Sequence, residues 1–357
     1  MILVSGAGIA GLTLANALEQ LGMDYQLFER ESHVQAAGAG IVLHDNALHV
    51  LGALGLADDL PGTALHSMQI GDKKALQNLN FHKNTGTPAH AIHRQELMQR
   101  LLQNIPSERI LTGSAALRAQ QKSSQVELQL EHQTAKGSLL IVADGTSSQL
   151  HAQADMQNSG QWCWRAVVPY TGDQHHASEY WTGRHRLGLI PVGDKRAYVF
   201  HVMSAATHEH SAEHLAWIQQ QDLQALDFTQ AHWLSHPLQQ RKIQWGEGRI
   251  IAIGDAAHAM TPNMGLGAAT AMEDAWQLAE LLRVSSDYSE LLATFKSLRH
   301  RRVRNIQRQS WIIGEIAHWQ RKPLRMLRDV FTRLTPSHML TRNQANLMRD
   351  FTKLMPS

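Results

Sequence analysis

The first thirty residues constrain the fold of this chain more than any other stretch. A short apolar run, residues 2–4, leads directly into Gly6-Ala7-Gly8-Ile9-Ala10-Gly11. After the third glycine, Leu14, Leu18 and Leu21 fall at helical spacing, which predicts a helix with one apolar face. Residues 26–28 then resemble a second strand, which ends at Glu29. The pattern predicts a strand, a glycine turn, a helix and a parallel strand.

Each glycine of this turn has a mechanical reason. The first permits the tight turn, the second lets the backbone approach a pyrophosphate, and the third lets the helix pack closely on the strand. Free N–H groups and the positive dipole end at the helix N-terminus favour an anion there. Glu29 stands where an acidic side chain binds a ribose hydroxyl. We therefore predict a dinucleotide site, and the alternative is a βαβ unit that holds no ligand.

Two more apolar strands end in a pairing of glycine with aspartate. Residues 138–143 run into Asp144-Gly145, and residues 249–253 run into Gly254-Asp255. Farther on, Gly265-Leu266-Gly267 begins a long alanine-rich helix. A glycine pair before a helix N-terminus aims backbone donors at an electron-rich group.

The middle of the chain changes character and predicts an antiparallel sheet. Residues 164–170 read as one strand, and residues 187–192 and 196–203 form a hairpin around Gly193-Asp194-Lys195. Residues 212–240 return to a helical pattern. Such a sheet between two α/β stretches is typical of a layer that covers a substrate.

Composition narrows the class of protein. With 357 residues, 43% of them hydrophobic, the chain can bury a sizeable core in one large or two interlocked domains. Its single cysteine, Cys163, excludes an internal disulfide and a cysteine-rich metal site. The first strand leaves no room for a targeting segment, and no apolar stretch is long enough to cross a bilayer. We expect a cytoplasmic protein.

With these motifs, the chain resembles the class A flavoprotein monooxygenases, the aromatic hydroxylase family typified by para-hydroxybenzoate hydroxylase. It is most similar to the short branch of urate, salicylate and zeaxanthin-type monooxygenases. The resemblance covers roughly residues 1–310 and rests on the glycine turn, on Asp144-Gly145, and on Gly254-Asp255 with Pro262, Gly265 and Gly267. It implies an α/β fold in which a Rossmann-like FAD-binding domain is interleaved with a smaller antiparallel β-sheet substrate domain and followed by C-terminal helices.

The resemblance also implies boundaries and ligands. The FAD domain would comprise residues 1–65, 89–155 and 246–295, the substrate domain residues 66–88 and 156–245, and a basic helical region residues 296–357. The implied cofactor-binding residues are Gly6, Gly8, Ala10, Gly11, Glu29, Arg30, Gly40, Ile41, Arg94, Asp144, Asp255, Gly265, Leu266 and Gly267. No metal site is expected. The spacing of His208, His210 and His214 suits a solvated loop better than a metal centre, because no carboxylates accompany it.

The implied reaction is hydroxylation of an aromatic or heteroaromatic small molecule with O2 and NADPH or NADH, through a C4a-hydroperoxyflavin. Pro262, His201 and Arg165 are the candidate catalytic residues, with Pro262 near the flavin and Arg165 able to attract an acidic substrate. The substrate could be a polycyclic antibiotic of the tetracycline type. A non-enzymatic flavin sensor or sequestering protein is another alternative, because His151 replaces an arginine that the family usually has near the nicotinamide.

Charge is unevenly distributed along the chain. Residues 296–357 hold 14 of the 33 Lys and Arg but only 3 of the 31 Asp and Glu, a balance of +11, which leaves −9 for the rest. Basic side chains alternate there with apolar ones, which suits peripheral contact with an anionic membrane. The alternative is that these helices pack on the acidic body and neutralise it. No nucleic acid partner is expected, and the chain should act as a monomer or homodimer.

Overall fold

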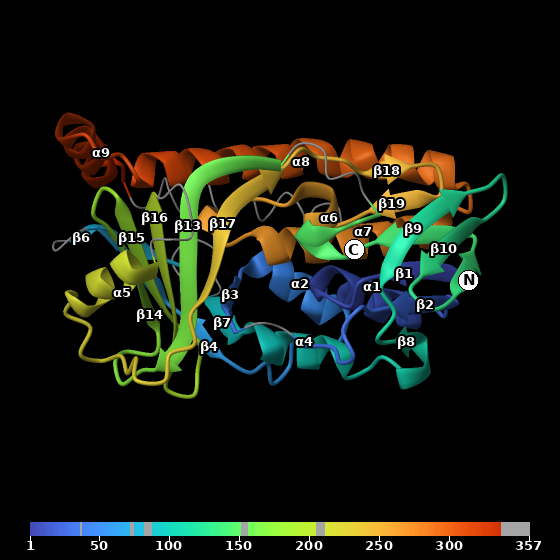
Figure 1. Ribbon diagram of the computed structural model, residues 1–357, viewed down its shortest axis with the longest axis horizontal. Coiled ribbons are helices and arrows are strands. Elements are labelled where there is room, and N and C mark those ends of the chain that lie inside the picture. The colour runs from blue at the N-terminus through green and yellow to red at the C-terminus, as the bar shows by residue number, and fades with distance from the viewer. Residues whose placement is uncertain (36–37, 72–74, 82–87, 151–155, 205–210, 337–357) are drawn as a thin grey trace.

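The computed structural model describes residues 1–35, 38–71, 75–81, 88–150, 156–204 and 211–336. The molecule is elongated, with a parallel sheet towards one end and an antiparallel sheet towards the other (Figure 1). The long helix α8 runs along both (Figure 1). This mixed α/β architecture confirms the expected fold class.

The parallel sheet is built around the first strand. Ile2 pairs with Tyr25 on one side and with Leu139 on the other, both in parallel register. The sheet has the order β18-β19-β12-β1-β2-β8, and only the β18-β19 pair is antiparallel. Its strands are β1 Ile2–Ser5, β2 Tyr25–Phe28, β8 Ile110–Leu111, β12 Leu139–Val142, β18 Gly246–Glu247 and β19 Ile250–Ala252.

Helices cover this sheet and bury most of its apolar side chains. Leu12, Leu14 and Leu18 of the first helix are fully buried, and each contributes about 1.5–3 kcal/mol by leaving water. The same helix packs along α7, which begins at the third glycine motif. The helices of this half are α1 Ile9–Gln20, α2 Asp45–Ala53, α4 Arg94–Leu102, α6 Asp255–His258 and α7 Gly267–Val284.

A seven-stranded sheet forms the other half, in the order β17-β13-β16-β15-β14-β5-β6. The predicted hairpin is present, with Asp194 and Lys195 at positive φ in its turn. Strands from residues 67–80 join those from residues 156–241, so two separate stretches of the chain build this one sheet. The strands are β5 Ser67–Gly71, β6 Ala75–Asn80, β13 Met156–Pro169, β14 His176–Trp181, β15 His185–Pro191, β16 Arg196–Ser204 and β17 Leu234–Arg241.

The helical pattern expected over residues 212–240 is only partly present. Helix α5, Ser211–Gln219, ends early, and residues 234–241 form strand β17 instead. This strand lies at the edge of the sheet and contains Pro237. Proline has no backbone N–H to donate, and an edge strand tolerates it because one side of the strand needs no hydrogen bonds to a neighbour. Pairing with β13 therefore decides the structure of this segment, against its local pattern.

Among the described residues, two smaller sheets and three short helices complete the half that contains the parallel sheet. One sheet has the order β3-β7-β4 and the other β11-β10-β9. Their strands are β3 Gly40–Leu43, β4 Thr63–Leu65, β7 Ala89–His93, β9 Ala116–Gln121, β10 Val126–Leu130 and β11 Thr134–Gly137. The short 3-10 helices are η1 Ser107–Arg109, η2 Gly145–Ser147 and η4 Pro262–Met264.

The C-terminal region contains α8, Tyr288–Ala317, and α9, Lys322–Leu334. Asp287 caps α8 by accepting hydrogen bonds from the backbone N–H groups of Ser289 and Glu290. None of the helices in the described ranges has the length and apolar character needed to cross a membrane.

Candidate functional site

The glycine turn leaves open space at one of its three glycines. A Cβ on Gly6, whose φ is +97°, would lie 2.6 Å from the carbonyl oxygen of Ala143, and one on Gly11 would lie 1.9 Å from that of Gly6. A Cβ on Gly8 would meet no described atom within 4 Å. Two glycines thus serve close packing of helix on strand, while Gly8 keeps room beside the N-terminus of α1.

That N-terminus is prepared for an anion. Within α1, Gly8 is the N-cap without a capping side chain, and Ala10 and its neighbours in the first turn include no acidic residue. Glu29 follows β2, and its carboxylate accepts hydrogen bonds from the N–H groups of Ala7 at 2.7 Å and Glu31 at 3.0 Å. Arg30 is exposed and pairs with Glu31. The free N–H groups and the helix dipole favour a phosphate at Gly8.

The second motif meets the first directly. A Cβ on Gly6 would lie 2.6 Å from the Cα of Asp144, and the Ser5 hydroxyl donates to Asp144 Oδ2 at 3.5 Å. Burial raises the pKa of Asp144, and its Oδ1 is buried without a hydrogen-bond partner in the described part of the chain. An unsatisfied buried oxygen beside the glycine turn fits a hydroxyl-bearing ligand.

The third motif approaches the same turn from the other side. A Cβ on Gly254, at φ +59°, would lie 3.1 Å from the Cβ atoms of both Ala10 and Ala271. Asp255, the first residue of α6, is exposed. Gly265 has φ of +65° and no described atom within 4 Å of a built Cβ.

Helix α7 offers a second uncapped N-terminus. It begins at Gly267 after Leu266, with no capping side chain and no acidic residue in its first turn. A Cβ on Gly267 would have only Met260 as near as 4.0 Å among described residues. Backbone donors are thus exposed beside η4, which contains Pro262.

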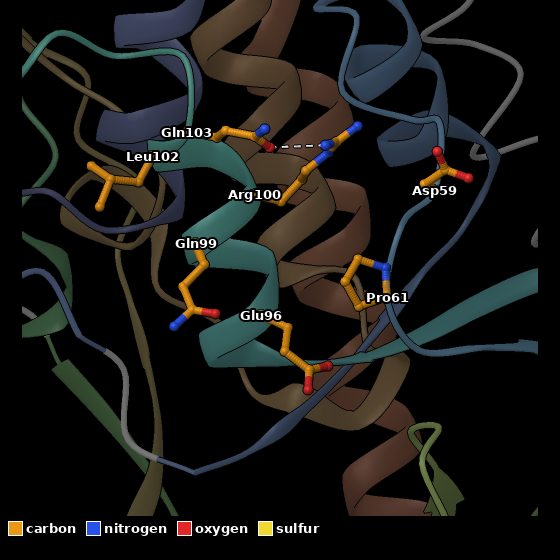
Figure 2. Close-up of a pocket in the computed structure, with 7 residues that line it drawn as sticks. All are labelled: Asp59, Pro61, Glu96, Gln99, Arg100, Leu102 and Gln103. Atoms are coloured by element: carbon orange, nitrogen blue, oxygen red, sulfur yellow. Dashed lines mark hydrogen bonds between the residues drawn. The ribbon is translucent and has the colours of Figure 1, made fainter.

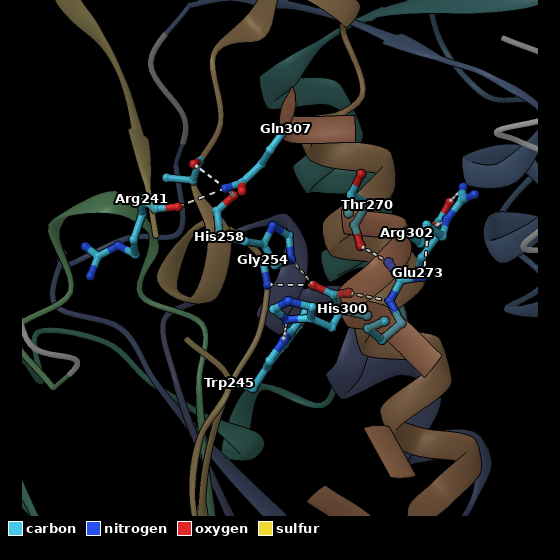
Figure 3. A network of polar contacts seen from close by, with 12 residues as sticks. Arg241, Trp245, Gly254, His258, Thr270, Glu273, His300, Arg302 and Gln307 are labelled. Carbon is cyan, nitrogen blue, oxygen red and sulfur yellow. Dashed lines mark hydrogen bonds and ion pairs between the residues drawn. The ribbon is translucent and has the colours of Figure 1, made fainter. Parts of the chain in front are cut away.

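A buried ionic network holds this third motif in place (Figure 3). Asp274 accepts from the N–H of Gly254 at 3.0 Å and from Arg299 Nε at 2.7 Å, and it contacts His258. Burial alone would raise the pKa of Asp274, but His258 and Arg299 outweigh burial and lower it.

The neighbouring carboxylate extends the network. Glu273 pairs with Arg299 at 2.8 Å and with Arg302, both from α8, and Asn46 of α2 donates to it. The sequence motifs alone gave Glu273 and Asp274 no role. The sequence signal for this network is a pair of adjacent acidic residues in one helix and two arginines one helical turn apart in the next. Only the packing of α7 on α8 brings the acidic residues and the arginines together.

Gly40 and Ile41, two of the expected cofactor-binding residues, lie against the antiparallel sheet. Gly40 and Ile41 of β3 pair with residues of β7, and the N–H of Arg94 donates to the Ala39 carbonyl at 2.8 Å. A Cβ on Gly40 would lie 2.5 Å from that of Tyr198, so glycine is needed where the two halves touch. The structure therefore brings Gly40, Ile41 and Arg94 together at the domain junction.

Arg94 lies close enough to Asp255 and Arg165 for both charges to act on it. Burial lowers the pKa of Arg94, with Asp255 opposing and Arg165 adding to the shift. Arg165 also lies close to Tyr198. The Nε atoms of both arginines are buried without partners among the described residues. Two incompletely satisfied guanidinium groups, of which that of Arg94 lies near Asp255, fit a polar ligand that carries acceptor oxygens.

Arg165 belongs to the inner face of the antiparallel sheet, which faces the half that contains the parallel sheet. It pairs across strands with Phe200, and Cys163 pairs with Val202 and with His236. Cys163, Phe200, Val202 and Leu238 form an apolar cluster. Burial lowers the pKa of His236 to about 4, and the nearby positive charge of Arg165 adds a smaller effect in the same direction. The inner face thus brings the Arg165 guanidinium next to apolar and uncharged groups.

His201 lies on the opposite, outer face of the same sheet. It pairs with Trp164, is fully buried, and stacks on Trp217 of α5 with ring centroids 4.4 Å apart. Its ring nitrogens contact His185 at 3.0 Å and His214 at 2.8 Å. Burial lowers its pKa to about 2. The structure therefore separates His201 from Arg165, because successive residues along a strand point to opposite faces.

A buried polar chain that sequence reasoning missed ties the inner face to η4. Arg186 Nε pairs with Glu179 at 2.7 Å, and its Nη1 donates to the side chain of Asn263. Trp181 donates to the same Glu179 carboxylate. Asn263 follows Pro262 directly, so these polar side-chain contacts fix the position of Pro262 relative to the sheet.

Other candidate sites have weaker structural support. A shallow surface pocket on α4 includes Glu96, Gln99 and Arg100 (Figure 2), but Arg100 already donates to Gln103, Leu56 and Asp58. The described residues contain no cluster of three or more potential metal ligands. His151, His208 and His210 lie outside the described residues.

Comparisons with known proteins agree with this arrangement. The family described as FAD binding domain matches residues 1–310. The chain is 33% identical over 362 residues to 2-heptyl-3-hydroxy-4(1H)-quinolone synthase of Pseudomonas aeruginosa, covering 94% of each. It is 30% identical to 3-hydroxybenzoate 6-hydroxylase of Polaromonas naphthalenivorans, covering 94% of this chain and 92% of that protein.

A solved structure shares the whole fold. Klebsiella pneumoniae HpxO, complexed with FAD and uric acid, matches with a TM-score of 0.86 and 22% identity over 98% of this chain and 97% of that one. The three glycine and aspartate motifs meet at the turn Gly6–Gly11, and the space at Gly8 beside the uncapped N-terminus of α1 forms a cradle that suits a pyrophosphate. The chain belongs to the FAD-binding-domain family and is a class A flavoprotein monooxygenase.

Proposed function

We propose that this monooxygenase hydroxylates C3 of a 4(1H)-quinolone that carries an apolar chain at C2. It consumes O2 and a reduced nicotinamide, as its family does. The proposal draws on the similarity to 2-heptyl-3-hydroxy-4(1H)-quinolone synthase over nearly the whole length of both chains. The structural observation that carries it is the inner face around Arg165, where apolar and uncharged side chains lie beside its guanidinium.

We assign the cofactor's parts to the residues around the cradle. The pyrophosphate would lie at Gly6, Gly8, Ala10 and Gly11, with Glu29 on the adenosine ribose and Arg30 near the adenine. Gly40, Ile41, Arg94, Asp144 and Asp255 would surround the ribityl region, and Gly265, Leu266 and Gly267 the flavin ring. The open space at Gly8, Gly265 and Gly267 supports this placement. When bound, FAD transfers electrons from nicotinamide to O2 and supplies the oxygenating chemistry.

The inner face would orient the substrate. Arg165 has a buried Nε to offer to the quinolone carbonyl oxygen, and a hydrogen bond to a charged donor is stronger than a neutral one. Phe200, Val202 and Leu238 would contact the apolar ring and chain. Pro262, fixed through Asn263 and Arg186, would border the reacting carbon and exclude water from it. His201, which lies on the outer face, would have only a packing role.

The experiment compares two substrates on the FAD-loaded protein. We expect 2-heptyl-4(1H)-quinolone to accelerate NADH or NADPH oxidation and to yield the 3-hydroxylated product, while 3-hydroxybenzoate gives neither. Acceleration by 3-hydroxybenzoate alone, with a ring-hydroxylated acid as product, would refute the quinolone assignment. Oxidation that yields only hydrogen peroxide with either compound would refute both.

Oligomeric state and location are also proposals. We expect a monomer or homodimer in the cytoplasm. The buried free thiol of Cys163, whose pKa burial raises to about 11, suits a reducing compartment. Size-exclusion chromatography with light scattering measures the oligomeric state directly, and a tetramer or larger assembly would contradict the proposal.

A further inference from the structure

Helix α9 lies at the end of the molecule, beyond α8 and beside the antiparallel sheet (Figure 1). Its apolar residues Leu324, Leu327, Phe331 and Leu334 fall at i, i+3, i+7 and i+10, on one side of the helix. In an ordinary surface helix this side would face the core. Here it faces solvent, and the exposed fractions rise from 37% at Leu324 to 63% at Phe331 and 75% at Leu334.

The polar side of α9 is the one that contacts the body. Arg328 is 2% exposed, donates to the carbonyl oxygen of Ala317 at 3.0 Å, and lies over the Trp181 ring. Its charge is matched by Asp329 at 2.7 Å. Gln77 of β6 donates to the carbonyl oxygens of Thr332 and Thr335. The helix is therefore held firmly with its apolar side outward.

The basic tail divides into two parts with different roles. In α8, Arg299 and Arg302 bind Glu273 and Asp274, so these cations do neutralise the acidic body. At α9, Arg321, Lys322 and Arg333 are exposed, while Asp329 is the only acidic residue and is used by Arg328. The exposed apolar side of α9 is thus bordered by unneutralised positive charge.

We propose that α9 docks on an anionic phospholipid surface. Its apolar side chains enter the boundary between head groups and acyl chains, and the exposed cations meet lipid phosphates. An apolar side bordered by lysine and arginine matches that surface in both polarity and charge. The docked end also contacts Trp181, which is linked through Glu179 and Arg186 to the loop at Asn263. An apolar substrate dissolved in the bilayer would therefore meet the protein near the inner face of the sheet.

The test is co-sedimentation of the full-length, FAD-loaded protein with vesicles. One set of vesicles is phosphatidylcholine alone, and the other contains phosphatidylglycerol as well. We expect pelleting with the anionic vesicles that weakens as salt is raised. The triple variant Leu327→Gln, Phe331→Gln, Leu334→Gln should lose at least about tenfold in apparent affinity, because its apolar contact with lipid is removed.

The matched control replaces two exposed leucines elsewhere, Leu117→Gln in β9 and Leu215→Gln in α5, which are 42% and 46% exposed. It should bind vesicles as the unmodified protein does. Equal pelleting with neutral and anionic vesicles, no pelleting, or unchanged binding of the triple variant would each overturn the proposal. So would a dimer in sedimentation velocity that the triple variant breaks, without vesicle binding, since a second copy would then cover α9. Vesicle binding is read without substrate and therefore stands apart from the quinolone assignment.

Discussion

The Asp274 carboxylate accepts a hydrogen bond from the backbone N–H of Gly254, 3.0 Å away, and so ties the turn after β19 to helix α7. The same carboxylate binds Arg299 of α8 and contacts His258 of α6. The turn that presents Asp255 to the cradle is therefore positioned by buried charges on other elements. Its own local sequence supplies only the glycine conformation.

Replacing Asp274 should weaken both the fold and the cofactor site. Asp274→Asn leaves Arg299 buried with one charged partner fewer, which should lower the free energy of unfolding by about 3 kcal/mol. Glu280→Gln is the control on the same helix, because its pairing with Arg283 is at the surface and should contribute less than about 0.5 kcal/mol. Urea denaturation of the two variants measures the difference, and similar losses would show that the network contributes little.

Gly8 and Gly11 should respond differently to alanine. Gly11→Ala places a Cβ 1.9 Å from the Gly6 carbonyl oxygen and should destabilise the apoprotein strongly. Gly8→Ala meets no described protein atom within 4 Å, so the apoprotein should unfold normally, while its affinity for FAD falls by about tenfold or more. Thermal unfolding and flavin fluorescence titration separate the two effects. Normal FAD binding by Gly8→Ala would place the pyrophosphate elsewhere.

Substitution of Arg165 should lower catalytic turnover, whereas substitution of His201 should lower stability. Arg165→Met should lower kcat/KM by about tenfold to a hundredfold, since it removes a charged hydrogen bond to the substrate. His201→Phe keeps a ring in the outer stack but loses its contacts with His185 and His214, so unfolding free energy should fall by about 1–3 kcal/mol. Its kcat/KM per bound flavin should stay within about twofold. A large loss of turnover in His201→Phe at full flavin content would contradict the face assignment.

Acid should destabilise the protein below about pH 6.5, the pKa of histidine in the unfolded chain. Burial lowers the pKa of His44, His214 and His318 to about 4 and that of His201 to about 2. The unfolded chain therefore binds more protons than the folded one between pH 6.5 and 4, so stability falls as pH falls. Each such histidine adds a slope approaching about 1.4 kcal/mol per pH unit. Denaturant titrations across that range that show constant or rising stability would contradict these pKa directions.

Local patterns in the sequence were enough for the parts of the site that local geometry decides. Residues close together in the sequence determine the turn at Gly6, Gly8 and Gly11, and the same holds for the hairpin at Asp194. The ends of β12 and β19 follow from apolar runs that stop at aspartate and glycine. In a parallel sheet such carboxyl ends lie at one edge, so their convergence also follows from the sequence.

Features that depend on pairing between distant residues were not accessible. Alternation predicts that Arg165 and Trp164 face opposite ways, but which face meets the flavin depends on where α5 packs. Residues 234–241 carry a pattern that suits a helix, and only their partner β13 makes them a strand. Arg299 looked like part of a basic tail, whereas it is buried against acids more than twenty residues earlier in the chain.

The most direct test of this account supplies FAD-loaded protein with 2-heptyl-4(1H)-quinolone, reduced nicotinamide and isotopically labelled O2. The account predicts a 3-hydroxylated quinolone that carries one labelled oxygen atom, formed in proportion to the nicotinamide oxidised. An unlabelled product, or nicotinamide oxidation with the quinolone recovered unchanged, would contradict it.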